Sequence, residues 1–355
     1  MSIHPYHKEL QVATLAIKRA SLLTKQLSDS IQELQTVGTI TKNDKSPVTL
    51  GDFASQAIIN YAIKLNFPSD EIVGEEDSKD LQTNSKLSSQ ILELIEDIQK
   101  ETKDYDSVLG SLKTVDQIYK SIDFGDSSGG SHGRFWALDP IDGTKGFLRG
   151  DQFAVCLALI EDGQVVLGVI GCPNLNEVII SNTEQKGTKG GLYSAIKGVG
   201  SYYSHLFEPG FIELNKQRRL KMSENVKPVD LKVVEGVEKG HSSHDTQSKI
   251  KSQLGFNPNT VSQQTINLDS QVKYCVLANG NADLYLRLPI NEQYSEKIWD
   301  HAAGNILVTE SGGKVSDITG NELNFGNGRL LESKGVIASN REIFDKVIDA
   351  IKQVT

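Results

Sequence analysis

Apolar residues recur at intervals of three or four positions from about residue 7 to residue 35, which is the period of an amphipathic helix. A polar stretch follows, and the next apolar positions predict a second helix that ends before Pro68. We place Asp52 at the entrance of this second helix, where a carboxylate can accept hydrogen bonds from unpaired N–H groups. Capping and catalysis are equally compatible with that position.

Two short apolar runs read as strands, and each delivers acidic residues at its end. Residues 71–74 lead into three successive acids at 75–77, and residues 135–138 lead into the motif D-P-I-D-G-T at 139–144. Thr144 is expected to cap a short helix whose N–H groups could bind a phosphate. Acidic turns of this kind are more often solvated loops, so neither turn identifies a site by itself.

Further strands follow the motif. Residues 153–173 hold two β-rich runs around Asp162-Gly163, which is a strong hairpin signal, and residues 191–204 continue the pattern with glycine bends. These runs predict an antiparallel sheet. Residues 78–133, which precede the sheet strands, read as an inserted and mostly helical region that ends in a glycine-serine loop.

The second half of the chain alternates strands with helices. We expect strands at 231–238, 282–289 and 335–339, and helices at 241–254, from 298 onward and at the C-terminus. The polar segment 205–230 reads as a linker. We therefore divide the chain into an N-terminal α+β domain at 1–220 and a C-terminal α/β domain at 221–355.

Composition narrows the range of functions. The net charge is −9 and no basic stripe is evident, which argues against a nucleic-acid polymer as partner. The three cysteines lie far apart in apolar runs, so we expect buried, reduced thiols, as in a cytoplasmic protein. No apolar run reaches the roughly 18 residues of a membrane span, and the N-terminus lacks a signal-peptide core.

Acidic residues from distant parts of the chain suggest a metal site. If Glu75, Asp139, Asp142 and Asp300 converge, their carboxylates repel one another unless cations lie between them. Magnesium suits such a set because it prefers oxygen ligands and keeps positions for water and phosphate. No Cys/His cluster has zinc spacing. We read His241, His244 and Asp245 as residues at the start of a helix.

The order E-E, D-P-I-D-G-T and W-D resembles the signature of the lithium-sensitive, magnesium-dependent phosphomonoesterases, which include inositol monophosphatase and the bisphosphate nucleotidases. The resemblance extends from residues 40–52 to residues 299–313. Segments 234–245, 268–275 and 285–289 are similar to the fungal 3′(2′),5′-bisphosphate nucleotidases. This resemblance implies a layered α/β/α/β/α sugar-phosphatase fold of the α+β class, with the active site between two sub-domains.

The resemblance also implies a role for individual residues. Asp52 and Thr144 would take a proton from the attacking water. The ligands of about two or three Mg²⁺ ions would be Glu75, Asp139, the Ile141 carbonyl, Asp142 and Asp300. The substrate contacts would be Asp139, Gly143, Thr144, His241, Ser270, Lys273, Arg287 and Asp300.

The implied reaction is attack of a metal-activated water on the 3′-phosphate of adenosine 3′,5′-bisphosphate (PAP), which gives AMP and phosphate. The sulfated form of the nucleotide, 3′-phosphoadenylyl sulfate (PAPS), would be a second substrate. The same resemblance implies inhibition by lithium and sodium and a role in sulfur assimilation and salt tolerance, and we expect a monomer. Two alternatives stay open: the same chemistry on an inositol phosphate, and a non-catalytic nucleotide sensor.

Overall fold

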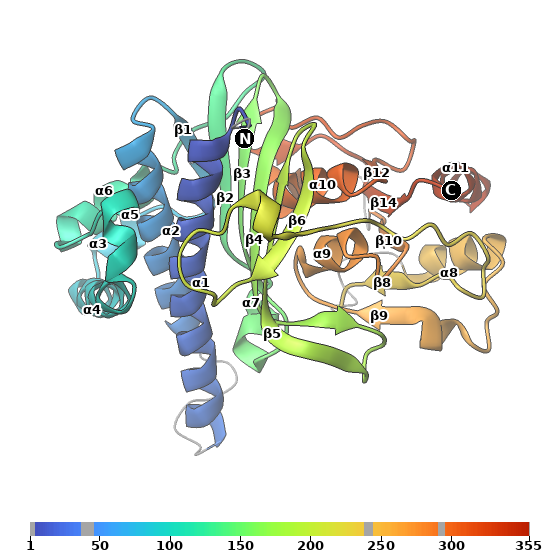
Figure 1. Cartoon of the computed structure of the whole chain (residues 1–355), viewed down its shortest axis with the longest axis horizontal. Coiled ribbons are helices and arrows are strands. Elements are labelled where there is room, and N and C mark those ends of the chain that lie inside the picture. Colours follow the sequence, from blue (N-terminus) through green and yellow to red (C-terminus); the bar gives the residue numbers. More distant parts are fainter. Residues whose placement is uncertain (1–3, 37–45, 238–243, 290–294, 355) are drawn as a thin grey trace.

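The computed structural model describes residues 4–36, 46–237, 244–289 and 295–354. Within these residues, helices and sheets alternate in layers (Figure 1). From one side to the other the order is helices, a large sheet, two helices, a smaller sheet and two more helices. The predicted layered α/β/α/β/α fold is therefore confirmed.

The large sheet has seven strands in sequence order. Its first pair is parallel and every later pair is antiparallel, as the hairpin pattern predicted. Asp162 and Gly163 both adopt positive φ at the tip of the β3–β4 hairpin, which is the conformation of a tight hairpin turn. The strands are β1 (Glu71–Gly74), β2 (Arg134–Asp142), β3 (Ala154–Glu161), β4 (Gln164–Ile179), β5 (Gln185–Ile196), β6 (Gly200–His205) and β7 (Arg218–Arg219).

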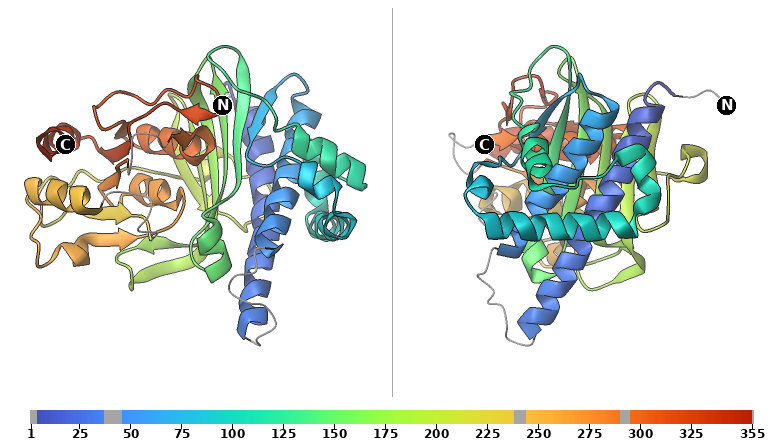
Figure 2. Two further views of the ribbon diagram at one scale, coloured as in Figure 1. Left: turned by 180° about the vertical axis from the view of Figure 1, so that it is seen from behind. Right: turned by 90° about the vertical axis from the view of Figure 1, so that its left-hand side faces the viewer.

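Two long helices, α1 (His7–Thr36) and α2 (Ser46–Asn66), cover one face of this sheet (Figure 2). The inserted region forms short helices that pack on α2 through a separate apolar cluster. Gly110, at φ 66°, ends α5, and the next helix, α6, begins at Val115. The inserted helices are α3 (Lys79–Gln82), α4 (Ser85–Glu101), η1 (Lys103–Tyr105), α5 (Asp106–Leu109) and α6 (Val115–Asp123).

Two helices, α9 (Val272–Ala278) and α10 (Ala302–Glu310), lie between the sheets and share one core with both. The second sheet has the order β12-β14-β10-β8-β9, and α8 (His244–Gln253) and α11 (Phe344–Val354) pack on its outer face. Its strands are β8 (Val233–Glu235), β9 (Thr265–Asn267), β10 (Leu284–Arg287), β12 (Gly313–Ser316) and β14 (Val336–Asn340). The remaining elements are α7 (Thr144–Arg149), η2 (Leu214–Lys216), η4 (Val261–Gln264), η5 (Ile298–Asp300), β11 (Glu296–Lys297) and β13 (Leu330–Leu331).

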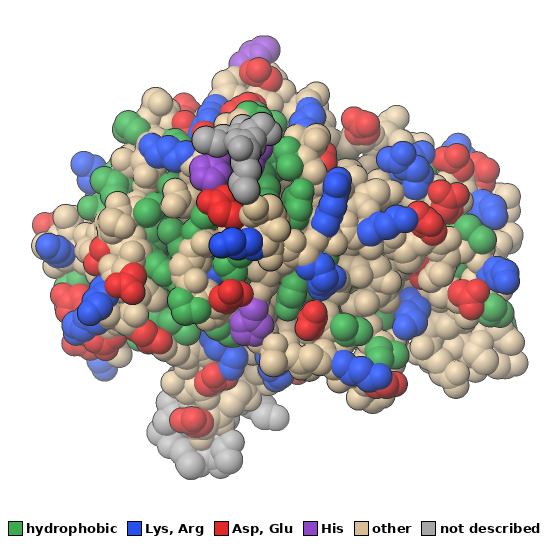
Figure 3. Space-filling model, viewed as in Figure 1, with side chains coloured by type: hydrophobic (Ala, Val, Ile, Leu, Met, Phe, Trp, Pro, Cys, Tyr) green, Lys and Arg blue, Asp and Glu red, His purple; other side chains and the backbone are tan. Residues whose placement is uncertain are grey.

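Two general expectations can be compared with the structure. All three cysteines are free and buried, as predicted, and the sulfurs of Cys172 and Cys275 lie 3.6 Å apart. Acidic and basic side chains are interspersed over the described part of the face in Figure 3, where no continuous basic surface is seen. Among the described residues, none of the helices combines the length and the apolarity needed to cross a membrane.

Candidate functional site

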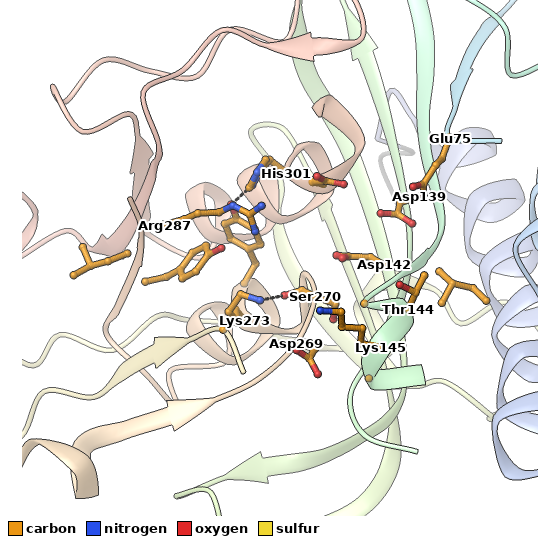
Figure 4. Close-up of a pocket in the computed structure, with 18 of the residues that line it drawn as sticks. Glu75, Asp139, Asp142, Thr144, Lys145, Asp269, Ser270, Lys273, Arg287 and His301 are labelled. Atoms are coloured by element: carbon orange, nitrogen blue, oxygen red, sulfur yellow. Dashed lines mark hydrogen bonds between the residues drawn. The ribbon is translucent and has the colours of Figure 1, made fainter. Parts of the chain in front are cut away.

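A pocket of about 360 Å³ opens where the carboxyl end of β2 faces the second sheet. Figure 4 shows acidic side chains from the first half of the chain on one side of it and cationic side chains from the second half on the other. Residues predicted as site residues and found in its lining are Glu75, Asp139, Ile141, Asp142, Gly143, Thr144, Ser270, Lys273, Arg287 and Asp300.

The central motif is part of a strand rather than a turn. Strand β2 continues through Asp142, and its register with β3 shifts between Asp139 and Asp142. This irregularity lets both carboxylates line the pocket although they are three residues apart. Thr144 is the first residue of α7 and makes no capping bond; Gly143, at φ 90°, holds the cap position instead. The predicted cap by Thr144 is therefore wrong.

Two more acids come from distant segments. Glu75 directly follows β1, which pairs with β2 in parallel, so the ends of both strands meet at the same edge of the sheet. Asp300 ends the short helix η5, which contacts β2 and β3, and lies at the entrance of α10. Glu75, Asp139, Asp142 and Asp300 therefore line one cavity, although the first and last are separated by more than half of the chain.

These acids raise one another's pKa values. Burial, followed by repulsion from Glu75 and Asp142, raises the pKa of Asp139 well above its usual range. Burial and the nearby Asp142 do the same for Asp300. Solvent reaches Glu75 through the pocket, yet the surrounding protein and Glu76 raise its pKa to about 7. Such a group of carboxylates takes up either protons or cations.

Asp52 was expected at the entrance of its helix, and this position is wrong. Helix α2 begins at Ser46, so Asp52 lies inside the helix and cannot act as its cap. Its side chain is buried, and no described residue donates a hydrogen bond to its Oδ1 atom. Burial, together with repulsion from Glu76 and Glu75, raises the pKa of Asp52 well above its usual range. The capping role of Asp52 is therefore excluded, and its catalytic role stays a prediction.

The opposite wall carries cations on α9 and β10. Lys273 is 5% exposed, and its Nζ donates to the carbonyls of Ser270 (2.6 Å) and Leu268 (3.3 Å). Burial lowers the pKa of Lys273 to about 8, although Asp142 acts in the opposite direction. Ser270 adopts the left-handed conformation at φ 61°, which serine seldom occupies, and the following N–H, from Gln271, donates to Asp142 at 2.5 Å.

Sequence reasoning missed a polar network behind this wall. Glu296 is 5% exposed and accepts from Arg287 Nε at 2.5 Å, while its other oxygen lies 3.3 Å from His301 Nε2. The second ring nitrogen of His301 lies 2.7 Å from the hydroxyl of Tyr274. Ligand atoms of Glu296, Asp300 and His301 fall within 4.8 Å of one another, which makes them a candidate metal-binding group. Glu296 is already paired, so Asp300 is the member best placed to bind an ion.

Of His241 and His244, the structure describes only His244. His241, expected in the nucleotide site, lies outside the described residues. His244 begins helix α8 and Asp245 follows it, which agrees with the helix start read from the sequence.

Comparisons with known proteins agree with this fold. Residues 7–355 match the inositol monophosphatase family. The chain is 71% identical over 353 residues to 3′(2′),5′-bisphosphate nucleotidase 2 of Candida albicans, covering 99% of both proteins. It is 45% identical to the 3′(2′),5′-bisphosphate nucleotidase of Emericella nidulans, over 98% of this chain and 99% of that one. The solved structure of an inositol monophosphatase from Anabaena superposes with a TM-score of 0.57 at 20% identity, covering 98% of this chain and 96% of that one.

Proposed function

Because the chain belongs to the inositol monophosphatase family, and to the bisphosphate nucleotidases within it, we propose that it hydrolyses the 3′-phosphate of PAP to give AMP and phosphate. The observation that carries this proposal is the 71% identity to a bisphosphate nucleotidase over 99% of both chains. PAPS is the second proposed substrate, since it presents the same 3′-phosphate.

The acidic wall fits divalent cations. Asp139 Oδ1 and Asp52 Oδ1 are buried, and neither accepts a hydrogen bond from any described residue. Buried carboxylates without partners are costly, and cations between them remove that cost. Mg²⁺ would be held by Glu75, Asp139, the Ile141 carbonyl, Asp142 and Asp300, in a site of about two or three ions. When bound, Mg²⁺ lowers the pKa of water and stabilises negative charge on phosphate and ester oxygens.

The chain's own residues divide the remaining tasks. Asp52 and Thr144 form the pair that accepts the proton of the attacking water, a role for which a buried carboxylate of raised pKa is suited. Lys273 and Arg287 lie across the pocket and bind the second phosphate of the nucleotide, which a substrate with one phosphate lacks. Ser270 and His241 complete the nucleotide contacts. The reaction thus needs both walls: one binds the reacting phosphate, and the other selects a nucleotide that carries a second phosphate.

The test is a phosphate-release panel with PAP, PAPS, adenosine 3′-phosphate and inositol 1-phosphate, each with Mg²⁺ and with EDTA. We expect release from PAP and PAPS, weaker release from the two monophosphates, and none in EDTA. Faster release from inositol 1-phosphate than from PAP would replace the nucleotide assignment with an inositol phosphatase. Tight binding of PAP without phosphate release in Mg²⁺ would make the protein a sensor.

The same family membership leads us to propose inhibition by lithium and sodium. A monovalent ion in a magnesium position supplies less charge to the reacting phosphate, so turnover falls. We further propose that the protein acts as a monomer in the cytoplasm, in sulfur assimilation and salt tolerance. Adding lithium and sodium salts to the release panel, with potassium as the ionic-strength control, tests the inhibition.

A further inference from the structure

Two of the acids that line the pocket belong to different halves of the chain. Glu75 follows the edge strand β1 of the large sheet, and Asp300 ends η5, a segment of the second half that contacts β2 and β3 of the same sheet. A divalent ion tolerates little change in the positions of its ligands, so the segments that carry these acids must be fixed relative to each other.

One guanidinium group joins the two segments. Arg329 lies just before β13, in the second half of the chain, and its side chain reaches the turn before Glu75. Its Nη2 donates to the carbonyl of Gly74 at 2.5 Å, and its Nη1 donates to the carbonyls of Gly125 and Ser127, each at 3.1 Å. Gly74 is the residue immediately before Glu75, so this contact acts directly on the backbone that places the carboxylate.

The other contacts of Arg329 are with the segment that ends in Asp300. Its guanidinium lies 4.9 Å from the centre of the Trp299 ring, and Trp299 is the residue immediately before Asp300. Its carbonyl accepts the N–H of Ile298 at 3.2 Å. The next residues of the chain, in β13, pair with β11, which leads into η5. Both the backbone and the side chain of Arg329 therefore hold the segment that ends in Asp300.

A second side chain, that of Gln56, fixes the residue after Glu75, but Gln56 belongs to the same half of the chain as Glu75. Gln56, fully buried in α2, donates to the carbonyl of Glu76 at 2.7 Å and accepts the N–H of Glu76 at 3.0 Å. Glu75 thus lies between a residue fixed by Gln56 and a residue fixed by Arg329. Gln56 ties the turn to the helix that carries Asp52, whereas Arg329 ties it to the segment of Asp300.

We propose that Arg329 is a positioning residue of the metal site, which keeps Glu75 and Asp300 in register across the two halves of the chain. The proposal rests on the Mg²⁺ site of the proposed function and adds a residue that touches neither ion nor substrate. The role needs arginine, because a planar guanidinium can donate to three carbonyls while it stacks on an indole, and an ammonium cannot do both. Loss of such supporting contacts weakens metal affinity by about 10–100-fold in other sites.

The experiment compares Arg329→Lys and Arg329→Gln with the unchanged protein. The matched control is Arg218→Lys. Arg218 also stacks on an aromatic ring, Tyr203 at 4.6 Å, and donates to Asn279 on another element at 2.8 Å, but it does not line the pocket. Mg²⁺ binding is titrated without substrate, by calorimetry and by tryptophan fluorescence, since Trp299 is one of two tryptophans. The Mg²⁺ concentration for half-maximal PAP hydrolysis and the KM for PAP at saturating Mg²⁺ are measured alongside.

We expect both Arg329 variants to bind Mg²⁺ at least about ten-fold more weakly, with the KM for PAP at saturating Mg²⁺ changed less than two-fold and the control unchanged. A variant that only loses thermal stability, with Mg²⁺ affinity as in the unchanged protein, would overturn the proposal. Because binding is measured without substrate, the proposal can hold even if PAP proves not to be the substrate.

A second measurement needs no variant. Amide hydrogen exchange of the unchanged protein is compared in EDTA and in Mg²⁺, for peptides that cover 74–76 and 298–300. We expect both segments to become protected over the same range of Mg²⁺ concentration. Protection of one segment without the other would show that they are not coupled, and would overturn the proposal even if the Arg329 variants did not fold.

Discussion

One buried acid, Asp139, lines the pocket, another, Glu296, lies behind its opposite wall, and the two acids behave in opposite ways. Asp139, 3% exposed, has one oxygen without any donor among the described residues, and its pKa is raised well above the usual range by burial and by neighbouring acids. Glu296, 5% exposed, is also penalised by burial, but His301 and Arg287 outweigh this and lower its pKa to about 2. Two carboxyl groups of similar burial therefore differ in their stable form: burial and neighbouring acids favour the protonated form of Asp139, whereas His301 and Arg287 favour the ionised form of Glu296.

The difference shows what each acid does. A carboxylate that is paired inside the protein stays ionised and fixes its partners, so Glu296 serves to hold Arg287 and His301. A carboxylate surrounded by other carboxylates is stable only after it takes up a proton or a cation. The charge of the acidic wall therefore favours an external cation, and the charge of the opposite wall favours an external anion. Each prediction below changes one of these walls and should leave the other intact.

The largest effect is expected from Asp300→Ala. Loss of a carboxylate that holds the ion removes several kcal/mol of transition-state stabilisation, or about 10³-fold or more in kcat. The melting temperature in EDTA should not fall, because the substitution also removes repulsion with Asp142. Steady-state kinetics and calorimetry measure both. Turnover near that of the unchanged protein would remove Asp300 from the mechanism, and the same reasoning applies to Asp142→Ala.

A smaller and more selective effect is expected from Glu296→Gln, behind the opposite wall. The substitution removes the charge that pairs with Arg287, whose Nε bonds Glu296 at 2.5 Å. The KM for PAP should rise about ten-fold, the size of one lost charge-assisted hydrogen bond. Adenosine 3′-phosphate, which lacks the second phosphate, should be affected much less, and kcat should change little.

The matched control for Glu296→Gln is Asp70→Asn. Asp70 is also a buried acid in an arginine pair, with Arg134 at 2.8 Å, but Arg134 does not line the pocket, whereas Arg287, the partner of Glu296, does. It should leave the KM for both substrates unchanged. An equal rise in KM for PAP and for adenosine 3′-phosphate would show that Glu296 supports the pocket generally rather than the second phosphate.

The local part of the site could be predicted from the sequence. An apolar run followed by polar residues is typical of a strand end and predicts the position of Glu75 after β1, but it does not predict that β2 continues through Asp139 to Asp142. The start of α2 is also readable from the sequence, because Ser46-Pro47 is a typical first turn of a helix, and this signal argues against placing Asp52 at the helix entrance. The domain division at 220 stays a prediction.

The supporting residues could not be predicted in this way. Arg329 and Gly74 are 255 positions apart, and an isolated arginine in a polar segment carries no period or motif. The same holds for Glu296, whose partner Arg287 belongs to a different strand. Periodicity reports which face of an element is buried, whereas these contacts depend on how distant elements are placed together.

The smallest expected effect is on the pH dependence of stability, which should differ between the metal-free and the metal-bound protein. The pKa of Glu75 is raised from 4.5 to about 7 in the folded, metal-free protein. Between these values the folded state holds a proton that the unfolded state has lost, so stability falls as pH rises from about 4.5 through 7. Asp139 and Asp300 are shifted in the same direction. In EDTA, the melting temperature should therefore be a few degrees higher at pH 6 than at pH 8.

Saturating Mg²⁺ should remove or reverse this trend, because the ion binds the deprotonated carboxylates. Glu75→Gln should reduce the difference in EDTA, since the amide has no proton to exchange, whereas Glu296→Gln should leave it. A melting temperature in EDTA that rises from pH 6 to pH 8 would contradict the picture of a wall of unpaired acids.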